Sequence, residues 1–112
     1  MKDYSVYLKD IIANIELAQR FIAGLTFETF STDDKTTYAV IRCVEIIGEA
    51  TKRVPHNMRQ QYPEVPWKSM TGARDFMAHD YGSIDMNKVW QMVKFDLPEL
   101  KPQIKKILAD LK

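Results

Sequence analysis

Apolar residues recur every three or four positions along most of the chain, which is the spacing of amphipathic α-helices. The first stretch of this kind runs from Tyr4 to about Leu25. The segment after it breaks the pattern, and capping residues between Ser31 and Asp34 predict a second helix that continues to about Val54, just before Pro55. Apolar residues occupy two sides of that helix. Its one polar stripe consists of Arg42, Glu45, Glu49 and Lys52. A helix of this kind is expected to be central and nearly surrounded.

The second half of the chain predicts three further helical segments. Pro66 is a favoured first position and Gly82 a favoured end for the third helix. Ser83 or Asp85 can cap a fourth helix, and Pro98 marks a bend before a final amphipathic segment. No stretch alternates as a β-strand does. The expected fold is therefore all-α, an antiparallel bundle of four to five helices in a single domain over residues 1–112.

Composition excludes several classes of function. The chain has 16 Lys and Arg against 15 Asp and Glu, so a net charge of +1 gives no overall attraction to nucleic acid, and any such site must be a local patch. A single cysteine, Cys43, cannot form an intrachain disulfide. The polar start and the lack of an apolar run of roughly 20 residues argue against secretion and membrane insertion. These features predict a cytoplasmic protein.

The stretch from Met70 to Trp90 concentrates charge, histidine and tyrosine around the predicted end of the third helix. On an ideal helix Arg74 and Tyr81 project within about 20° of each other, whereas His79 lies about 140° from Arg74. Asp75 comes four residues before His79, where its carboxylate can hydrogen-bond the imidazole and orient it. Arg74 and Tyr81 should therefore project together, Arg74 and His79 can reach one substrate only if the helix end relaxes or Arg74 reaches around, and Asp75 is a candidate orienting residue for His79.

The spacing of Arg74, His79 and Tyr81 resembles the R-x4-H-x-Y motif of HepT-like toxins in the HEPN superfamily. The resemblance covers nearly the whole chain, because several other segments are also similar to that family. They are IIGEATKRV (46–54), PWKSMTGARD (66–75), YGSIDMNKVW (81–90) and DLPEL (96–100). The resemblance implies a HEPN-like, dimeric helical fold and an endoribonuclease that uses neither metal nor cofactor. It also implies that Arg74 and His79 are the catalytic residues.

RNA cleavage through the 2′-hydroxyl needs a base, an acid and a cation for the phosphate charge. His79 suits the base and Arg74 the cation. The chain has only one other histidine, His56, which is expected to be exposed. A two-fold homodimer that brings two copies of His79 into one cleft would supply the acid. HEPN nucleases are similarly dimeric.

Resemblance to HepT also implies a partner and a regulatory modification. The partner would be a minimal nucleotidyltransferase antitoxin similar to MntA, as in type VII toxin–antitoxin systems. Tyr81 would be the acceptor of the AMP that this enzyme transfers, at a position just before Gly82 where the hydroxyl can enter another protein's pocket.

A second hypothesis is a non-catalytic dimeric module that binds a nucleotide or the nucleotidyltransferase. It is favoured by Asp75, because many HEPN nucleases have Asn there and a carboxylate repels phosphate. Without the family resemblance, Arg74 would be interpreted as a surface ion-pair partner of Asp75, Glu45 or Glu49. Those two glutamates indicate a solvated or ion-paired face rather than a metal site.

Overall fold

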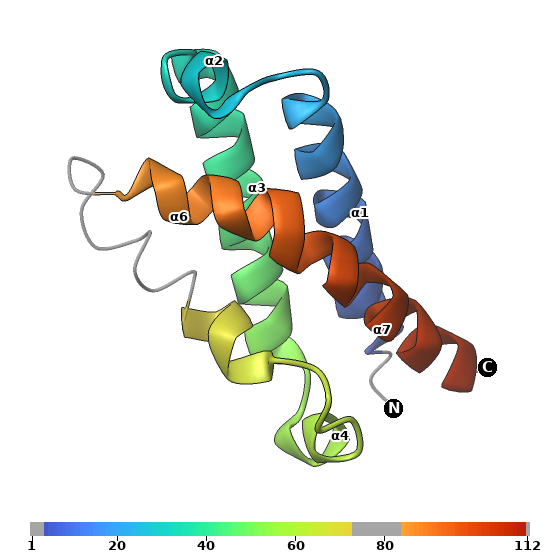
Figure 1. The fold of residues 1–112 in the computed structure, drawn as a ribbon. Helices are drawn as coiled ribbons and strands as arrows, with labels where there is room; N and C mark the ends of the chain where they lie inside the picture. Colours follow the sequence, from blue (N-terminus) through green and yellow to red (C-terminus); the bar gives the residue numbers. More distant parts are fainter. Residues whose placement is uncertain (1–3, 73–83, 112) are drawn as a thin grey trace.

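Helices joined by short connections make up the part of the chain that the computed structural model describes, residues 4–72 and 84–111 (Figure 1). Every regular element in those two ranges is helical, which confirms the all-α prediction there. None of the helices in the described residues is long and apolar enough to cross a lipid bilayer.

Two long antiparallel helices, α1 (Ser5–Ile22) and α3 (Asp34–Arg53), make the most extensive contact in the fold (Figure 1). The helical spacing of apolar residues places one face of each helix in the shared core. Fully or almost fully buried side chains on these faces are Leu8, Ile11, Ile15, Val40 and Val44. The predicted helix from Tyr4 to Leu25 is slightly shorter in the structure. It ends before Gly24, whose φ of 77° lies in the left-handed region that favours glycine.

A short helix, α2 (Phe27–Ser31), occupies the segment that the apolar pattern left without an element. Thr26 and Thr29 cap each other's backbone N–H groups at its start, with distances of 3.1 and 2.9 Å. The side chain of Phe30 is completely buried and attaches this helix to the core. A helix of five residues is too short to show a helical period, so its apolar pattern could not predict it.

The predicted start and end of the central helix are confirmed. Asp33 caps α3 by accepting a hydrogen bond from the Thr36 backbone N–H at 3.3 Å, and the helix ends at Arg53, two residues before Pro55. One predicted apolar side is fully buried: Val40, Val44, Ile47, Thr51 and Val54. The other is buried at Cys43 and Ala50 and only half-buried at Ala39 and Ile46. After α3 comes the short helix α4 (His56–Gln60).

The last three elements form one uninterrupted helical run (Figure 1). They are α6 (Met86–Gln91), the π-helical turn η2 (Met92–Asp96) and α7 (Leu97–Asp110). Pro98 lies in the first turn of α7, where its missing N–H is tolerated. The π turn ends at Asp96, directly before the first residue of α7, and such turns occur where the regular hydrogen-bond ladder is interrupted. This run packs on α1, and a 2.9 Å ion pair between Lys101 and Glu16 joins α7 to α1.

Candidate functional site

The four predicted site residues, Arg74, Asp75, His79 and Tyr81, fall in residues 73–83, outside the described residues. Their roles therefore stay predictions. The structure does describe the two chain segments that lead into and out of this stretch, residues 67–72 and Ile84 onward, together with the polar stripe of α3. These parts show how the fold anchors both ends of the candidate site.

The upstream segment is helical over residues 67–72, in agreement with a third helix that begins near Pro66. Trp67 and Met70 are buried, and Met70 donates a backbone hydrogen bond to the Pro66 carbonyl at 3.1 Å. The indole Nε1–H of Trp67 also donates to the Tyr62 carbonyl at 2.9 Å, so the connector is fixed to the helix it precedes. The helical segment 67–72 is thus attached to the core through two large side chains, those of Trp67 and Met70.

The downstream segment is anchored by a cap and by aromatic packing. The Asp85 carboxylate accepts hydrogen bonds from the backbone N–H groups of Asn87 at 2.9 Å and Lys88 at 3.4 Å, which confirms one of the two predicted caps. Trp90 packs edge-on against Phe27 of α2, with ring centroids 6.2 Å apart, and lies 5.2 Å from the ring of Phe30. After residues 73–83 the chain therefore continues into a helix that is capped by Asp85 and packed against α2 through Trp90.

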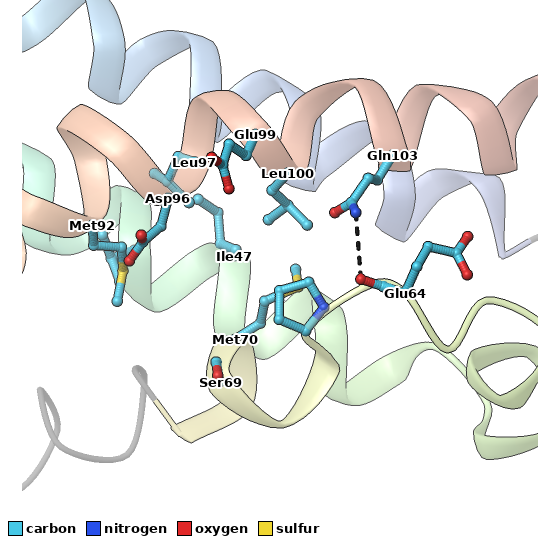
Figure 2. A pocket seen from close by; sticks show the side chains of 12 residues that line it. Ile47, Glu64, Ser69, Met70, Met92, Asp96, Leu97, Glu99, Leu100 and Gln103 are labelled. Atoms are coloured by element: carbon cyan, nitrogen blue, oxygen red, sulfur yellow. Dashed lines mark hydrogen bonds between the residues drawn. The ribbon is translucent and has the colours of Figure 1, made fainter.

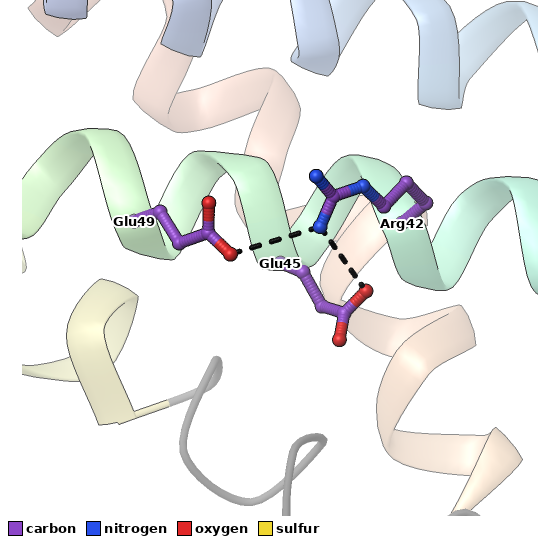
Figure 3. Close-up of polar contacts among 3 residues, drawn as sticks. All are labelled: Arg42, Glu45 and Glu49. Atoms are coloured by element: carbon purple, nitrogen blue, oxygen red, sulfur yellow. Dashed lines mark ion pairs between the residues drawn. The ribbon is translucent and has the colours of Figure 1, made fainter.

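The polar stripe of α3 carries a three-residue ion network (Figure 3). The Arg42 guanidinium lies 3.7 Å from the Glu45 carboxylate and 3.6 Å from that of Glu49. The ion-paired face predicted for the two glutamates is confirmed, with Arg42 of the same stripe as their cation. Within residues 4–72 and 84–111, no three His, Cys, Asp or Glu residues are grouped so that they could hold one metal ion.

A cavity of about 370 Å³ lies between α3, residues 64–70 and the η2–α7 run (Figure 2). Its apolar wall is formed by Val44, Ile47, Met70, Met92, Leu97 and Leu100. Its lining includes three acidic residues, Glu64, Asp96 and Glu99, and no lysine or arginine among the described residues. Carboxylates repel phosphate, so we expect the RNA backbone to bind elsewhere. Apart from the family-like segment at 96–100, no pattern in the sequence indicated this cavity.

The second histidine of the chain, His56, lies on α4. His56 is the first residue of α4 and is exposed, as predicted. Among the described residues the chain therefore brings no histidine to the stripe or the cavity.

Comparison with known proteins gives consistent similarities over almost the full length. The profile of the HepT-like family, described as "Ribonuclease HepT-like", matches residues 11–107. "Probable ribonuclease HepT" of Thermococcus cleftensis is 42% identical over 106 residues, which covers 95% of this chain and 96% of that protein. A Methanocaldococcus jannaschii protein named "Putative RNase" is 37% identical over 110 residues, with 98% of this chain and 95% of its own covered. No solved structure gives a significant match.

Proposed function

Because the chain belongs to the HepT-like ribonuclease family, we propose that it is a metal-independent endoribonuclease toxin of a type VII toxin–antitoxin system. One observation carries this proposal: the match to the family spans residues 11–107 and includes Arg74, His79 and Tyr81 at the R-x4-H-x-Y spacing. The anchored segments on both sides of the motif support it, since a catalytic constellation needs a rigid base.

In the proposed reaction His79 removes the proton of a 2′-hydroxyl, and the 2′-oxygen attacks the adjacent phosphorus. The bond to the 5′-oxygen breaks, which leaves a 2′,3′-cyclic phosphate and a 5′-hydroxyl. Arg74 stabilises the charge that builds up on the phosphate oxygens, and Asp75 orients the imidazole. The water-activating role of a metal ion is not needed, because the nucleophile belongs to the RNA itself.

The leaving 5′-oxygen needs a proton from a second acid. His56 is exposed on α4 and belongs to a different element from the motif, so it is a poor candidate. We therefore propose a homodimer in which His79 of the second copy donates this proton. Histidine acids and bases typically contribute about 10² to 10⁴ in rate.

A cleavage assay on purified, unmodified protein tests this function. We expect RNA cleavage in the presence of chelators, with products that carry 2′,3′-cyclic phosphate. His79→Ala and Arg74→Ala are expected to lower the rate by at least about 10²-fold, while the matched control His56→Ala leaves it unchanged. Cleavage that survives both motif substitutions, or that needs a divalent metal, would overturn the proposed mechanism.

We further propose that Tyr81 accepts AMP from an MntA-like nucleotidyltransferase antitoxin: the Tyr81 oxygen attacks the α-phosphorus of ATP bound by that enzyme, the tyrosine gives up its proton, and pyrophosphate leaves. The added phosphate would place a negative charge beside the guanidinium that holds RNA and so suppress binding. Co-expression with the antitoxin is expected to add adenylyl groups, seen by intact-mass analysis, to the native chain and to the control Tyr38→Phe. Tyr38 is an exposed tyrosine outside the motif. Modification of Tyr81→Phe would refute this assignment.

A second candidate function is a non-catalytic dimeric module that binds a nucleotide or the nucleotidyltransferase. Asp75 is the observation that favours it, because this acidic residue directly follows, in the sequence, the arginine that should hold phosphate. Growth arrest on expression of this chain alone supports only the toxin. If the native chain is inactive and Asp75→Asn restores cleavage, the binding module is the better description.

A further inference from the structure

A second stripe of α3 is exposed and shares Arg42 and Glu49 with the polar stripe described above. It contains Tyr38, Arg42, Glu49 and Arg53, which fall within about 60° of one another at 100° per residue. Tyr38 is 69% exposed, the most exposed of the large apolar side chains in the described residues. The side chains of Arg42 and Glu49 are 60% and 45% exposed. The stripe extends over about 22 Å of helix, since each residue rises about 1.5 Å.

The order of residues in this stripe is self-complementary. Arg42 and Glu49 lie equally far from its middle, and Tyr38 and Arg53 lie equally far on either side of them. If a second copy of α3 is placed antiparallel on the first, each Arg42 meets a Glu49 and each Tyr38 meets an Arg53. A two-fold axis repeats both contacts, as an isologous interface requires. The first is an ion pair, and the second is a cation–π contact.

We infer that this stripe is the surface on which two copies of the chain pair, with their α3 helices antiparallel and Arg42 of each opposite Glu49 of the other. The inference rests on the homodimer in the proposed function and names its contact surface and register.

Interactions within one chain prepare the stripe for this role. The Arg42 guanidinium already forms ion pairs with the carboxylates of Glu45 and Glu49 on the same helix, at 3.7 and 3.6 Å (Figure 3). The Glu45 side chain is only 15% exposed, and its pairing with Arg42 limits repulsion between the two copies near the axis. The Arg53 guanidinium lies 6.0 Å from the ring of Tyr7, so it is already held beside an aromatic side chain. Side chains that are ordered beforehand lose less entropy on association.

Two charge reversals test the register. Arg42→Glu places like charges opposite each other twice in its own homodimer, and so does Glu49→Arg. When the two variants are mixed, both contacts become opposite-charge pairs. We expect each variant alone to dissociate more readily than the native protein. The mixed dimer should then dominate, with a dissociation constant roughly ten-fold or more below that of either variant homodimer by native mass spectrometry. The double variant with both reversals should pair like the native chain.

General attraction between oppositely charged chains needs a matched control. Arg20→Glu and Glu28→Arg change exposed residues outside the stripe. From a net charge of +1 they give chains of −1 and +3, the same charges as the two test variants. This mixture should show no preference for the mixed dimer. Circular dichroism verifies that every variant remains helical.

The outcomes separate this inference from the proposed function. Suppose that the native protein is dimeric and cleaves RNA, but the mixture of Arg42→Glu and Glu49→Arg favours the mixed dimer no more than the control mixture does. The stripe is then a solvated face and the inference is wrong. If the native protein is monomeric at micromolar concentration by light scattering, the proposed dimer fails together with its surface. A preferred mixed dimer supports the inference whether or not the protein cleaves RNA.

Discussion

Asp33 couples the stability of α3 to pH. Hydrogen bonds from the Thr36 hydroxyl at 2.8 Å and the Thr36 backbone N–H at 3.3 Å lower the pKa of its carboxyl below the ordinary value. A lowered pKa stabilises the folded state above the pKa of the unfolded chain, and this contribution is lost as pH falls through the folded pKa. We therefore expect Asp33→Ala to lower the unfolding temperature near neutral pH and to lose this effect in strong acid.

Thermal unfolding of native protein, Asp33→Ala and Asp33→Asn across pH checks this prediction. Asparagine keeps a cap without a titrating group, so the difference between native protein and Asp33→Asn should contain only the charge-dependent part. A difference between Asp33→Ala and native protein that stays constant down to strong acid would contradict the role of the ionised carboxylate.

At the scale of residues, local chemistry could be predicted from the sequence and long-range partners could not. Asp33 and Asp85 were among the predicted caps because a cap depends only on the next three residues. The glutamates of α3 were predicted to form a solvated or ion-paired face, and the structure identifies Arg42 of the same helix as a cation that pairs with both. Which cation reaches a carboxylate depends on side-chain placement that helical spacing alone does not determine.

Among the helices, α2 is attached to the core mainly by the buried ring of Phe30. Phe30 is completely buried and its ring centroid lies 5.2 Å from that of Trp90 on α6. Removal of a buried phenylalanine typically costs about 3 to 5 kcal/mol, because apolar contacts are lost and a cavity remains. We expect Phe30→Ala to lower the free energy of unfolding in urea by about that amount. The control Phe21→Ala removes a ring that is 39% exposed and should cost less than about 1 kcal/mol. Equal losses would show that α2 does not pack as described.

The π turn shows the limit of sequence reasoning about elements. Pro98 was predicted to mark a bend between two helical segments, and the structure has a continuous helical run with a π turn just before that proline. The apolar spacing of Val89, Val93 and Leu97 is compatible with either arrangement. An additional residue in one turn changes the spacing by too little to be recognised over five residues.

Distance along the chain decides what could be predicted about the whole molecule. The all-α architecture follows from local periodicity and is confirmed in the described residues. The cavity does not follow, because its wall joins Val44 of α3, Met70 and Leu97, which come from three separate segments. The candidate site was predicted from a motif within eight consecutive residues, 74–81, and those residues lie outside the described ranges. The roles of Arg74, His79 and Tyr81 are therefore tested by the cleavage and modification experiments described above.

Net charge predicts how RNA binding responds to salt. With a net charge of +1 the protein has no overall attraction to RNA, so binding should depend on a few local cations. Each phosphate neutralised on a single strand contributes about −0.7 to the slope of log affinity against log salt concentration. If Arg74 of each copy in a dimer holds one phosphate, we expect a slope of about −1.4. Fluorescence anisotropy with single-stranded RNA and the inactive variant His79→Ala measures this slope without cleavage.

Addition of Arg74→Ala to that variant should bring the slope close to zero, because the proposed phosphate contacts are then lost. Arg20→Ala, added in the same way, removes an exposed arginine on α1 and should leave the slope unchanged. A slope steeper than about −4 would mean that the RNA contacts six or more phosphates. Lys52, which is exposed in the last turn of α3 and is not part of the inferred dimer contact, would then be the first residue to test as part of an extended RNA-binding surface.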